Sequence, residues 1–327
     1  MSIFFARNKR ITQLIYILLL LAVFLTAFFY LPEENIQQPS TQPVTSSTQK
    51  TPLLAQNNDI NTLRPNASTP ALKTDTTTNE PTPLVILQKT NWKQANNFYD
   101  AFSQLKVAAQ NGDAEAKYVI AANLRYCLSS PIDDAALQKQ LDEVSLYGDA
   151  GTAIDNLVEK FNYCGGITQA ERAQFFSYLE DAAHSGSIAA QESFASLTPE
   201  FYMASQGFKS LTRDDYIAER DAFVAQQVTF LNQSAQRGSE LALKRLSGLY
   251  HTQNLTDNSL ANSYAINRVI MELTDNDSTF NRYAWFEQRQ YPLLSAEEQQ
   301  SAEEIFEFWI STIRANGTFY PSKKPHS

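Results

Sequence analysis

The chain has 327 residues, a net charge of −9 and a pI near 5.0, and this acidity argues against nucleic acid or anionic lipid as the main ligand of its soluble part. Only 10 glycines stand among many Ala, Leu, Gln and Glu residues, a composition that favours helix over sheet. Two cysteines are too few for a disulfide scaffold or a zinc cage.

The first predicted element is a membrane-spanning helix over residues 11–31. This stretch has no charged residue, and residues 14–31 are nearly all apolar. About 20 residues at about 1.5 Å each cross a hydrocarbon core of about 30 Å. Basic residues precede the stretch and glutamates follow it, so the positive-inside bias leaves residues 1–10 in the cytoplasm and exports everything after residue 31.

A cleaved signal peptide is the alternative interpretation of this segment. Its apolar region would be shorter, and a small-x-small cleavage site would follow. Here bulky Leu25 stands two positions before Ala27, and no cysteine follows that could accept a lipid. We therefore predict an uncleaved signal anchor in the inner membrane of a Gram-negative bacterium, with the C-terminal domain in the periplasm.

Residues 32–83 are a different kind of segment, rich in Thr, Ser, Gln, Asn and Pro. They hold eight of the chain's 13 prolines and cannot bury enough apolar surface to fold. We predict a disordered tether with a mean reach on the order of 40 Å. The acidic charge lies beyond it, because residues from 84 onward carry 20 Lys and Arg against 30 Asp and Glu, a balance of −10.

Residues 84–320 are predicted to form an all-α domain, followed by a disordered tail over 321–327. Four repeat-like units are expected between about residues 90 and 255. In three of them, at residues 108–112, 182–186 and 234–238, a helix ends on small residues. In each unit a glycine stops the helix in the left-handed conformation, and a new helix starts at once from an Asp or Ser cap. The glycines, spaced 36, 38 and 52 residues apart, are Gly112, Gly148, Gly186 and Gly238. The expected caps are Asp113, Asp149, Ser187 and Ser239.

The helix after each glycine repeats small and large residues at fixed positions. Small residues let two helices approach closely, and large ones fill the seam between them. The seam residues are Ala116, Ile120, Ala121 and Leu124 in the first copy, Ala153, Leu157, Val158 and Phe161 in the second, Ala190, Phe194 and Ala195 in the third, and Ala242, Leu246, Ser247 and Tyr250 in the last. Self-similarity at this period is typical of a helical repeat array.

These residues resemble the Sel1-like repeat family, a branch of the tetratricopeptide-like (TPR-like) helical repeats, whose signature runs roughly Ala-Ala-x-x-Gly-x-x-x-Ala-x-x-x-Leu-Gly-x-x-Tyr. The matching residues are Ala108, Ala109, Gly112, Ala116 and Ile120 in the first copy and Ala235, Gly238, Ala242, Leu246 and Tyr250 in the last. The family's glycine after the leucine is replaced in every copy, and the spacing is irregular after residue 186. The resemblance implies an α/α superhelix of antiparallel helix pairs that serves as an adaptor and has no catalytic residues.

Two further helices are predicted toward the C-terminus. Apolar residues recur on a helical period across residues 214–236. Ser295 and Glu298 form a capping box that opens an amphipathic helix ending at Asn316 and Gly317.

Cys127 and Cys164 stand at the ends of equivalent helices in the first two copies. In an oxidising compartment we predict that they form a disulfide, which contributes on the order of 3–4 kcal/mol in the chain-entropy model. Two unrelated buried thiols are the alternative, whereas a redox-active pair is disfavoured by the lack of a Cys-x-x-Cys motif. The bridge is expected to clamp the first two repeats at the end of the array nearest the tether.

No pattern in the sequence points to catalysis, a cofactor or a metal, and His184, His251 and His326 are interpreted as helix-end or tail residues. Residues 275–277, Asp-Asn-Asp, match the metal motif of type II glycosyltransferases, which share the layout of anchor, stem and exported domain. Residues 269–273 before them are more typical of a helix end than of a strand, so a loop or N-cap role is favoured.

The sequence therefore predicts a membrane-tethered, non-enzymatic scaffold that faces the periplasm, binds a protein or peptide and does not bind nucleic acid. Its acidic balance suggests a neutral-to-basic partner. Two alternatives stay open: an enzyme of the glycosyltransferase layout, and a periplasmic folding factor of the lipase-foldase layout. For the latter, residues 126–130 resemble a Tyr-x-Leu-Ser-Ala stretch, although Leu124 and Arg125 replace the Phe-Asp that should precede it.

Overall fold

The computed structural model describes residues 83–146, 150–253 and 258–322. The predicted cytoplasmic tail, the predicted anchor and all but the last residue of the predicted tether lie outside the described residues, as do Gly148 and Asp149. Across the described ranges the chain is mostly helical, which confirms the all-α fold class, and its two strands have 2 residues each. None of the helices in these ranges has the length and apolar character needed to span a bilayer.

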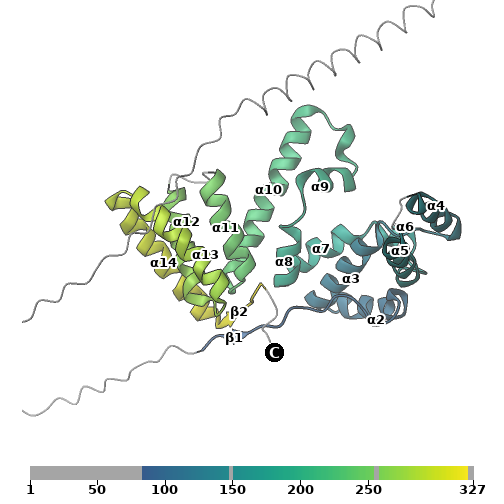
Figure 1. The fold of residues 1–327 in the computed structure, drawn as a ribbon, viewed down its shortest axis with the longest axis horizontal. Coiled ribbons are helices and arrows are strands. Elements are labelled where there is room, and N and C mark those ends of the chain that lie inside the picture. Colours follow the sequence, from purple (N-terminus) through teal and green to yellow (C-terminus); the bar gives the residue numbers. More distant parts are fainter. Residues whose placement is uncertain (1–82, 147–149, 254–257, 323–327) are drawn as a thin grey trace, which may run out of the picture. The chain divides into compact units, whose positions relative to one another are not determined.

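The helices follow one another through short connections (Figure 1). In chain order they are α2 (Phe98–Gln110), α3 (Ala114–Cys127), α4 (Asp134–Ser145), α5 (Gly151–Tyr163), α6 (Gln169–Arg172), α7 (Phe175–His184), α8 (Ile188–Phe194), α9 (Pro199–Ser205), α10 (Arg213–Gln236), α11 (Glu240–Gln253), α12 (Ser259–Leu273), α13 (Asp277–Gln290) and α14 (Ala296–Asn316). Two turns of 3₁₀ helix, η1 (Phe208–Ser210) and η2 (Tyr291–Leu293), stand between longer helices. The strands β1 (Val85–Ile86) and β2 (Thr318–Phe319) pair in parallel.

Three of the four predicted hairpin turns have the expected geometry. Gly112, Gly186 and Gly238 have φ angles of 90°, 90° and 78°, in the left-handed region that glycine tolerates best. The residue after each glycine caps the next helix by accepting a backbone N–H bond three residues on, at Asp113, Ser187 and Ser239. The Ser295–Glu298 capping box and the helix end at Gly317 are also present. All of these contacts are local, which is why the sequence pattern predicts them.

The helices pack in an order that differs from their order in the chain. α2 and α3 form one hairpin, α3 lies against α7, and α8 lies against α10. α11 then packs on α12, which also contacts α13 and α14. Nine of the seam residues predicted for copies one, three and four are buried, and two are half-buried: the buried ones are Ala116, Ile120, Ala121, Leu124, Ala190, Phe194, Ala242, Leu246 and Ser247, and the half-buried ones are Ala195 and Tyr250.

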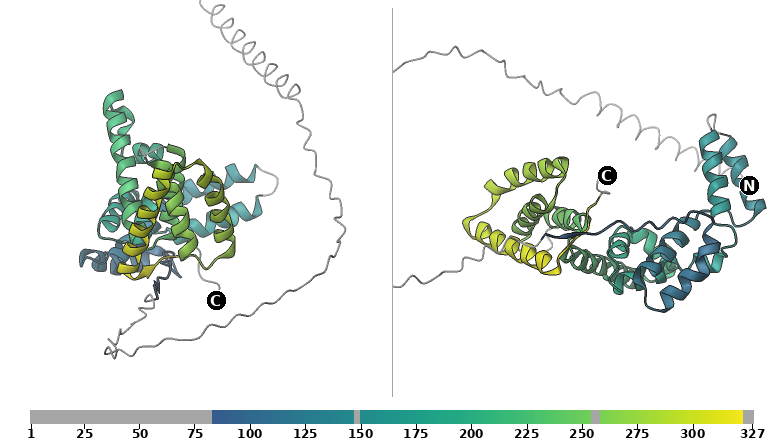
Figure 2. Two further views of the ribbon diagram at one scale, coloured as in Figure 1. Left: turned by 90° about the vertical axis from the view of Figure 1, so that its left-hand side faces the viewer. Right: turned by 90° about the horizontal axis from the view of Figure 1, so that it is seen from below.

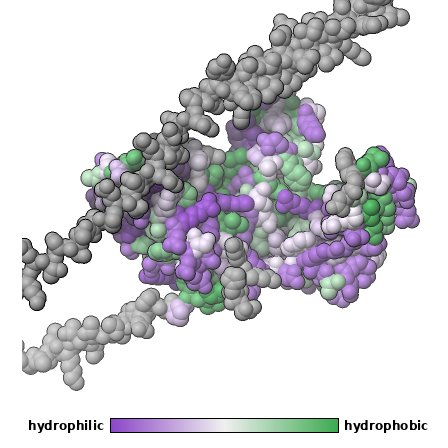
Figure 3. Space-filling view, viewed as in Figure 1, coloured by the Kyte–Doolittle hydropathy of each residue, from purple (hydrophilic) through white to green (hydrophobic). Residues whose placement is uncertain are grey.

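The second copy departs from the predicted seam. Its hairpin, α4–α5, buries no described residue of α4 and, within α5, buries Tyr163 alone. Ala153 is exposed, and Leu157, Val158 and Phe161 are half-buried. Figure 3 accordingly shows apolar surface at the end of the molecule where Figure 1 places this hairpin. The prediction of a buried second seam is wrong, because α3 packs on α7 and leaves α4–α5 beside the stack.

Residues 84–94 form an extended segment, which we call the strap, that runs from the C-terminal helices to the first hairpin (Figure 2). At its start, β1 pairs with β2. Midway, Lys89 Nζ lies 2.9 Å from Glu192 Oε2 on α8. Near its end, the carbonyl of Trp92 accepts a 2.7 Å hydrogen bond from Asn123 on α3. The chain thus enters the described domain beside β2, and the expectation that the disulfide end lies nearest the tether is wrong.

Candidate functional site

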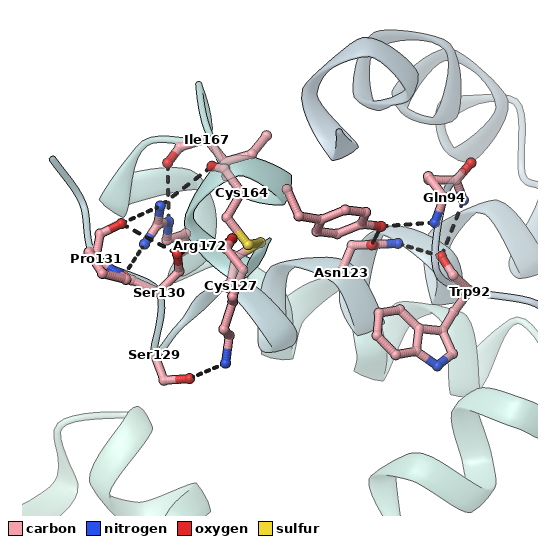
Figure 4. The surroundings of a disulfide bond; sticks show 12 residues. Trp92, Gln94, Asn123, Cys127, Ser129, Ser130, Pro131, Cys164, Ile167 and Arg172 are labelled. Carbon is pink, nitrogen blue, oxygen red and sulfur yellow. Dashed lines mark hydrogen bonds between the residues drawn. A yellow bond between two sulfur atoms is a disulfide. The ribbon is translucent and has the colours of Figure 1, made fainter. Parts of the chain in front are cut away.

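The predicted disulfide is present and joins two loops around one end of α3 (Figure 4). Cys127 is the last residue of α3, and Cys164 is the residue that follows α5. Their Cα atoms are 5.6 Å apart, and both side chains are fully buried. The bond therefore fixes the end of the α4–α5 hairpin against the end of α3.

A buried arginine braces the same junction from the other side. Arg172 on α6 donates from Nη1 to the carbonyl of Ser130 at 2.7 Å and from Nε to the carbonyl of Ile167 at 3.1 Å. Its Nη2 lies 3.4 Å from the carbonyl of Pro131. The fixed fork of a guanidinium suits this arrangement of several carbonyls (Figure 4). Arg172 thereby ties the loop after α3 to the loop after α5.

A third set of contacts fixes the strap beside the disulfide. The hydroxyl of Tyr163 donates to Asn123 Oδ1 and accepts a 2.8 Å bond from the backbone N–H of Gln94. Asn123 Nδ2 in turn donates to the carbonyls of Trp92 and Val119. Burial raises the pKa of Tyr163, so its phenol stays protonated and keeps donating. This network places the Trp92 side chain next to α3.

Trp92, Ser129 and Lys160 lie on the segments that these supports hold, and they help to line a cavity of about 330 Å³, which we call the trough. Its floor and one wall come from α3, through residues spaced i, i+3, i+4, i+7 and i+8, which share one face of a helix. The remaining walls come from the strap, the loop after α3, α5, α7 and α8. The lining residues are Trp92, Tyr118, Ala121, Ala122, Arg125, Tyr126, Ser129, Lys160, Leu179 and Ser193. The volume falls at the lower end of the range typical of ligand sites.

One end of the trough carries two cations without carboxylate partners. Among the described residues, neither Arg125 nor Lys160 forms an ion pair, and the trough lining includes no Asp or Glu. Lys160 Nζ donates to the Ser129 hydroxyl and lies 4.6 Å from the centre of the Tyr126 ring. Desolvation lowers the pKa of both the Arg125 guanidinium and the Lys160 ammonium, although Arg125 is exposed and Lys160 is half-buried.

The opposite end of the trough has a different electrostatic character. There the Tyr118 hydroxyl accepts a 3.4 Å bond from Ser193, and burial raises the pKa of Tyr118. Two nearby carboxylates are already engaged by the strap: Glu192 pairs with Lys89, and Glu115 accepts a 2.6 Å bond from Thr90. The trough is therefore positive at its Arg125 end and apolar and hydroxyl-lined at its Tyr118 end.

The site residues predicted from sequence divide between this region and the rest of the fold. Cys127 and Cys164 join the end of α3 to the residue after α5, and the glycines and small residues of the repeat pattern lie at the turns and seams of the stack, with Ala121 also lining the trough. Asn276 is the N-cap of α13, as favoured, and residues 269–273 end α12. No cluster of three potential metal ligands occurs in the described part of the chain.

Sequence reasoning missed the residues that line the trough. The helical spacing of Tyr118, Ala122 and Tyr126 is visible in the sequence and could have indicated a second face on α3. Trp92 and Lys160 carry no such signal, because they reach the trough only through the strap and the disulfide-linked hairpin.

The comparisons with known proteins add no family to this geometry. The chain matches no protein-family model, no curated protein and no solved structure.

Proposed function

We propose that this protein is a membrane-tethered, non-enzymatic scaffold of the Sel1-like type that holds a protein or peptide partner in the periplasm. The observation that carries the proposal is the trough, a concave site on a stack of helical hairpins, lined by aromatic and cationic side chains. Aromatic residues and arginine are enriched where proteins bind other proteins.

Three further observations support parts of the proposal. The repeated plan of left-handed glycine and capped helix at Gly112, Gly186 and Gly238 is the feature that the Sel1-like resemblance rests on. The Cys127–Cys164 bond favours an oxidising compartment, because disulfides form and persist outside the cytosol. The apolar stretch over residues 11–31, with basic residues before it, supports the tether.

Photo-crosslinking in the cell envelope tests the scaffold function. A photoreactive phenylalanine analogue replaces Tyr118 or Ser193 in the trough of the full-length chain, and Glu304 on the exposed face of α14 is the control position. We expect a discrete crosslinked species from the trough positions that the control lacks. Equal labelling at all three positions, or none, would contradict a scaffold that binds its partner at the trough.

Compartment and topology need a separate measurement. We expect the chain to resist alkaline extraction from membranes and its C-terminal domain to be digested by protease added to spheroplasts. Recovery of the chain in the soluble cytosolic fraction would rule out the tethered arrangement, whatever the crosslinking gives.

A further inference from the structure

We propose that the trough binds an extended peptide segment through an acidic side chain at the Arg125 end and an apolar side chain toward the Tyr118 end. This inference rests on the scaffold function proposed above and names the chemistry of the partner. The acidic balance of the sequence suggested a neutral-to-basic partner, whereas the trough favours an acidic one. The net charge of −9 does not show where in the fold the cations lie.

The charges that line the trough favour an acidic ligand. Arg125 and Lys160 line one small cavity, and within the described residues no carboxylate pairs with either. Arg125 is exposed and Lys160 is half-buried, and both attract an anion that enters the trough, because neither has a counter-charge in the described part of the fold. A guanidinium also offers paired N–H donors whose geometry matches a carboxylate. The site is thus complementary to a single acidic group.

The two ends of the trough differ in charge, which fixes where an acidic side chain lies. The carboxylates of Glu192 and Glu115 act on Tyr118 at the other end, where they oppose the attraction that Arg125 exerts on an anion. Both carboxylates already have partners in the strap: Lys89 forms an ion pair with Glu192, and Thr90 donates a hydrogen bond to Glu115. An acidic side chain is therefore favoured at the Arg125 end, and a neutral side chain at the Tyr118 end.

The length and the lining of the trough suit a short extended peptide. Tyr118 and Tyr126 are eight positions apart on α3, about 12 Å at about 1.5 Å per residue, which is the length of about four residues of extended chain. The floor is made from the small side chains of Ala121 and Ala122, which leave the hollow, and from Leu179. Aromatic walls from Trp92, Tyr118 and Tyr126 provide apolar contact for a side chain two residues from the acid, on the same side of the extended peptide.

Binding of defined peptides to the full-length chain in detergent tests the inference. The probe is acetyl-Ala-Phe-Ala-Asp-Ala-amide, together with the reversed order acetyl-Ala-Asp-Ala-Phe-Ala-amide, because the chain direction in the trough is open. Each of these two probes has a matched peptide that carries Asn in place of Asp. Trp92 fluorescence reports binding, and a Trp92→Phe variant shows that the signal comes from the trough.

We expect at least one Asp peptide to bind about tenfold more tightly than its Asn counterpart, since a charge-assisted bond replaces a neutral one. The Arg125→Gln/Lys160→Gln double variant should lose this preference. A Lys139→Gln/Arg213→Gln variant, which removes two exposed cations on α4 and α10, should keep it. Ala122→Leu should weaken Asp and Asn peptides alike, because it fills the hollow. Circular dichroism confirms that each variant is folded.

Three outcomes overturn the inference: equal binding of Asp and Asn peptides, equal loss in the trough and control variants, or no saturable signal at millimolar peptide. A fifth probe, the Asn peptide with a free C-terminal carboxylate, distinguishes a side-chain acid from a chain end. If it alone binds, the acidic side chain is the wrong ligand. A partner crosslinked at Tyr118 whose yield is unchanged in the Arg125→Gln/Lys160→Gln variant would leave the scaffold function standing and the acidic ligand refuted.

Discussion

The sulfur atom of Cys127, at the end of α3, is bonded to the sulfur atom of Cys164, just after α5, and this bond holds a peripheral hairpin against the helix that lines the trough. α4–α5 buries little of its own surface, so it depends on the bond, on the Arg172 contacts and on Tyr163 for its position. The disulfide thus acts on the position of Lys160 more than on the packing of the stacked helices.

Replacing both cysteines by alanine should lower the free energy of unfolding. The bond closes a loop with a sequence separation of 37 residues, and the chain-entropy model assigns to it a contribution of about 4 kcal/mol. Urea denaturation of the oxidised protein and of the double variant measures the difference. The wild-type protein with reductant is the control and should approach the variant. An unchanged midpoint in both would mean that the bond constrains the hairpin without stabilising the fold.

A comparison of two glycines separates backbone strain from steric clash. Gly112 and Gly238 both have positive φ, so alanine at either costs about 1 kcal/mol or more. A Cβ at Gly112 meets open space, whereas a Cβ at Gly238 would lie 2.3 Å from the carbonyl oxygen of Thr318. Gly238→Ala must therefore displace the backbone of β2.

We expect Gly238→Ala to lose at least about 2 kcal/mol more than Gly112→Ala, in the range of an overpacked core site. It should also expose the chain after residue 317 to protease. Urea denaturation gives the free energies, and mass spectrometry of brief digests locates the cleavage. Equal losses in the two variants, with an intact C-terminus, would show that β2 does not depend on the close approach at Gly238.

Arg172 offers a third test, because its charge is buried among backbone carbonyls and not beside an acid. Arg172→Met should lose about 3 kcal/mol, since it leaves the carbonyls of Ser130 and Ile167 without donors. Arg172→Lys keeps the positive charge but lacks the forked N–H donors of the guanidinium. Its stability should therefore exceed that of Arg172→Met by less than half of the Met variant's loss. Exposed Arg213→Met is the matched control and should change stability by less than about 0.5 kcal/mol. Full recovery by lysine would mean that charge, and not geometry, is what the junction requires.

The features that could be predicted from sequence are those made by neighbouring residues. The left-handed turn at Gly112, the cap at Asp113 and the capping box at Ser295 each depend on a few consecutive residues, so their patterns are readable directly. The Cys127–Cys164 pair was predictable because equivalent helices end on both residues.

The features that could not be predicted are those made by distant residues. Lys89 and Glu192 are 103 positions apart, and no periodicity in the strap marks it as a structured segment. The hairpin α4–α5 follows the small-and-large seam pattern in its sequence, yet its seam is at most half-buried, because α3 packs on α7. The trough combines both effects, since the strap supplies Trp92 and the hairpin supplies Lys160.

The pH dependence of stability provides the last test, at Tyr264 on α12. Burial, together with the 2.9 Å hydrogen bond that its hydroxyl donates to Glu287 Oε1, raises the pKa of Tyr264 to about 12. Unfolded tyrosine ionises near pH 10. Because the folded pKa lies above the unfolded one, the contribution of this phenol is fully present below pH 10 and is lost as pH rises from about 10 to about 12.

Tyr264→Phe should therefore be less stable than the wild type at pH 7, by about 1 kcal/mol for the lost hydrogen bond, and the difference should shrink and then reverse in sign as the pH rises from 10 to about 12. Phenylalanine has no proton to lose, so alkaline pH removes from the wild type a stabilisation that the variant never had. Urea denaturation at a series of pH values measures the difference, and Tyr99→Phe, at an exposed site, controls for the general effect of alkali. Parallel stability curves for Tyr264→Phe and the wild type would show that the bond to Glu287 does not favour the neutral phenol in the folded protein.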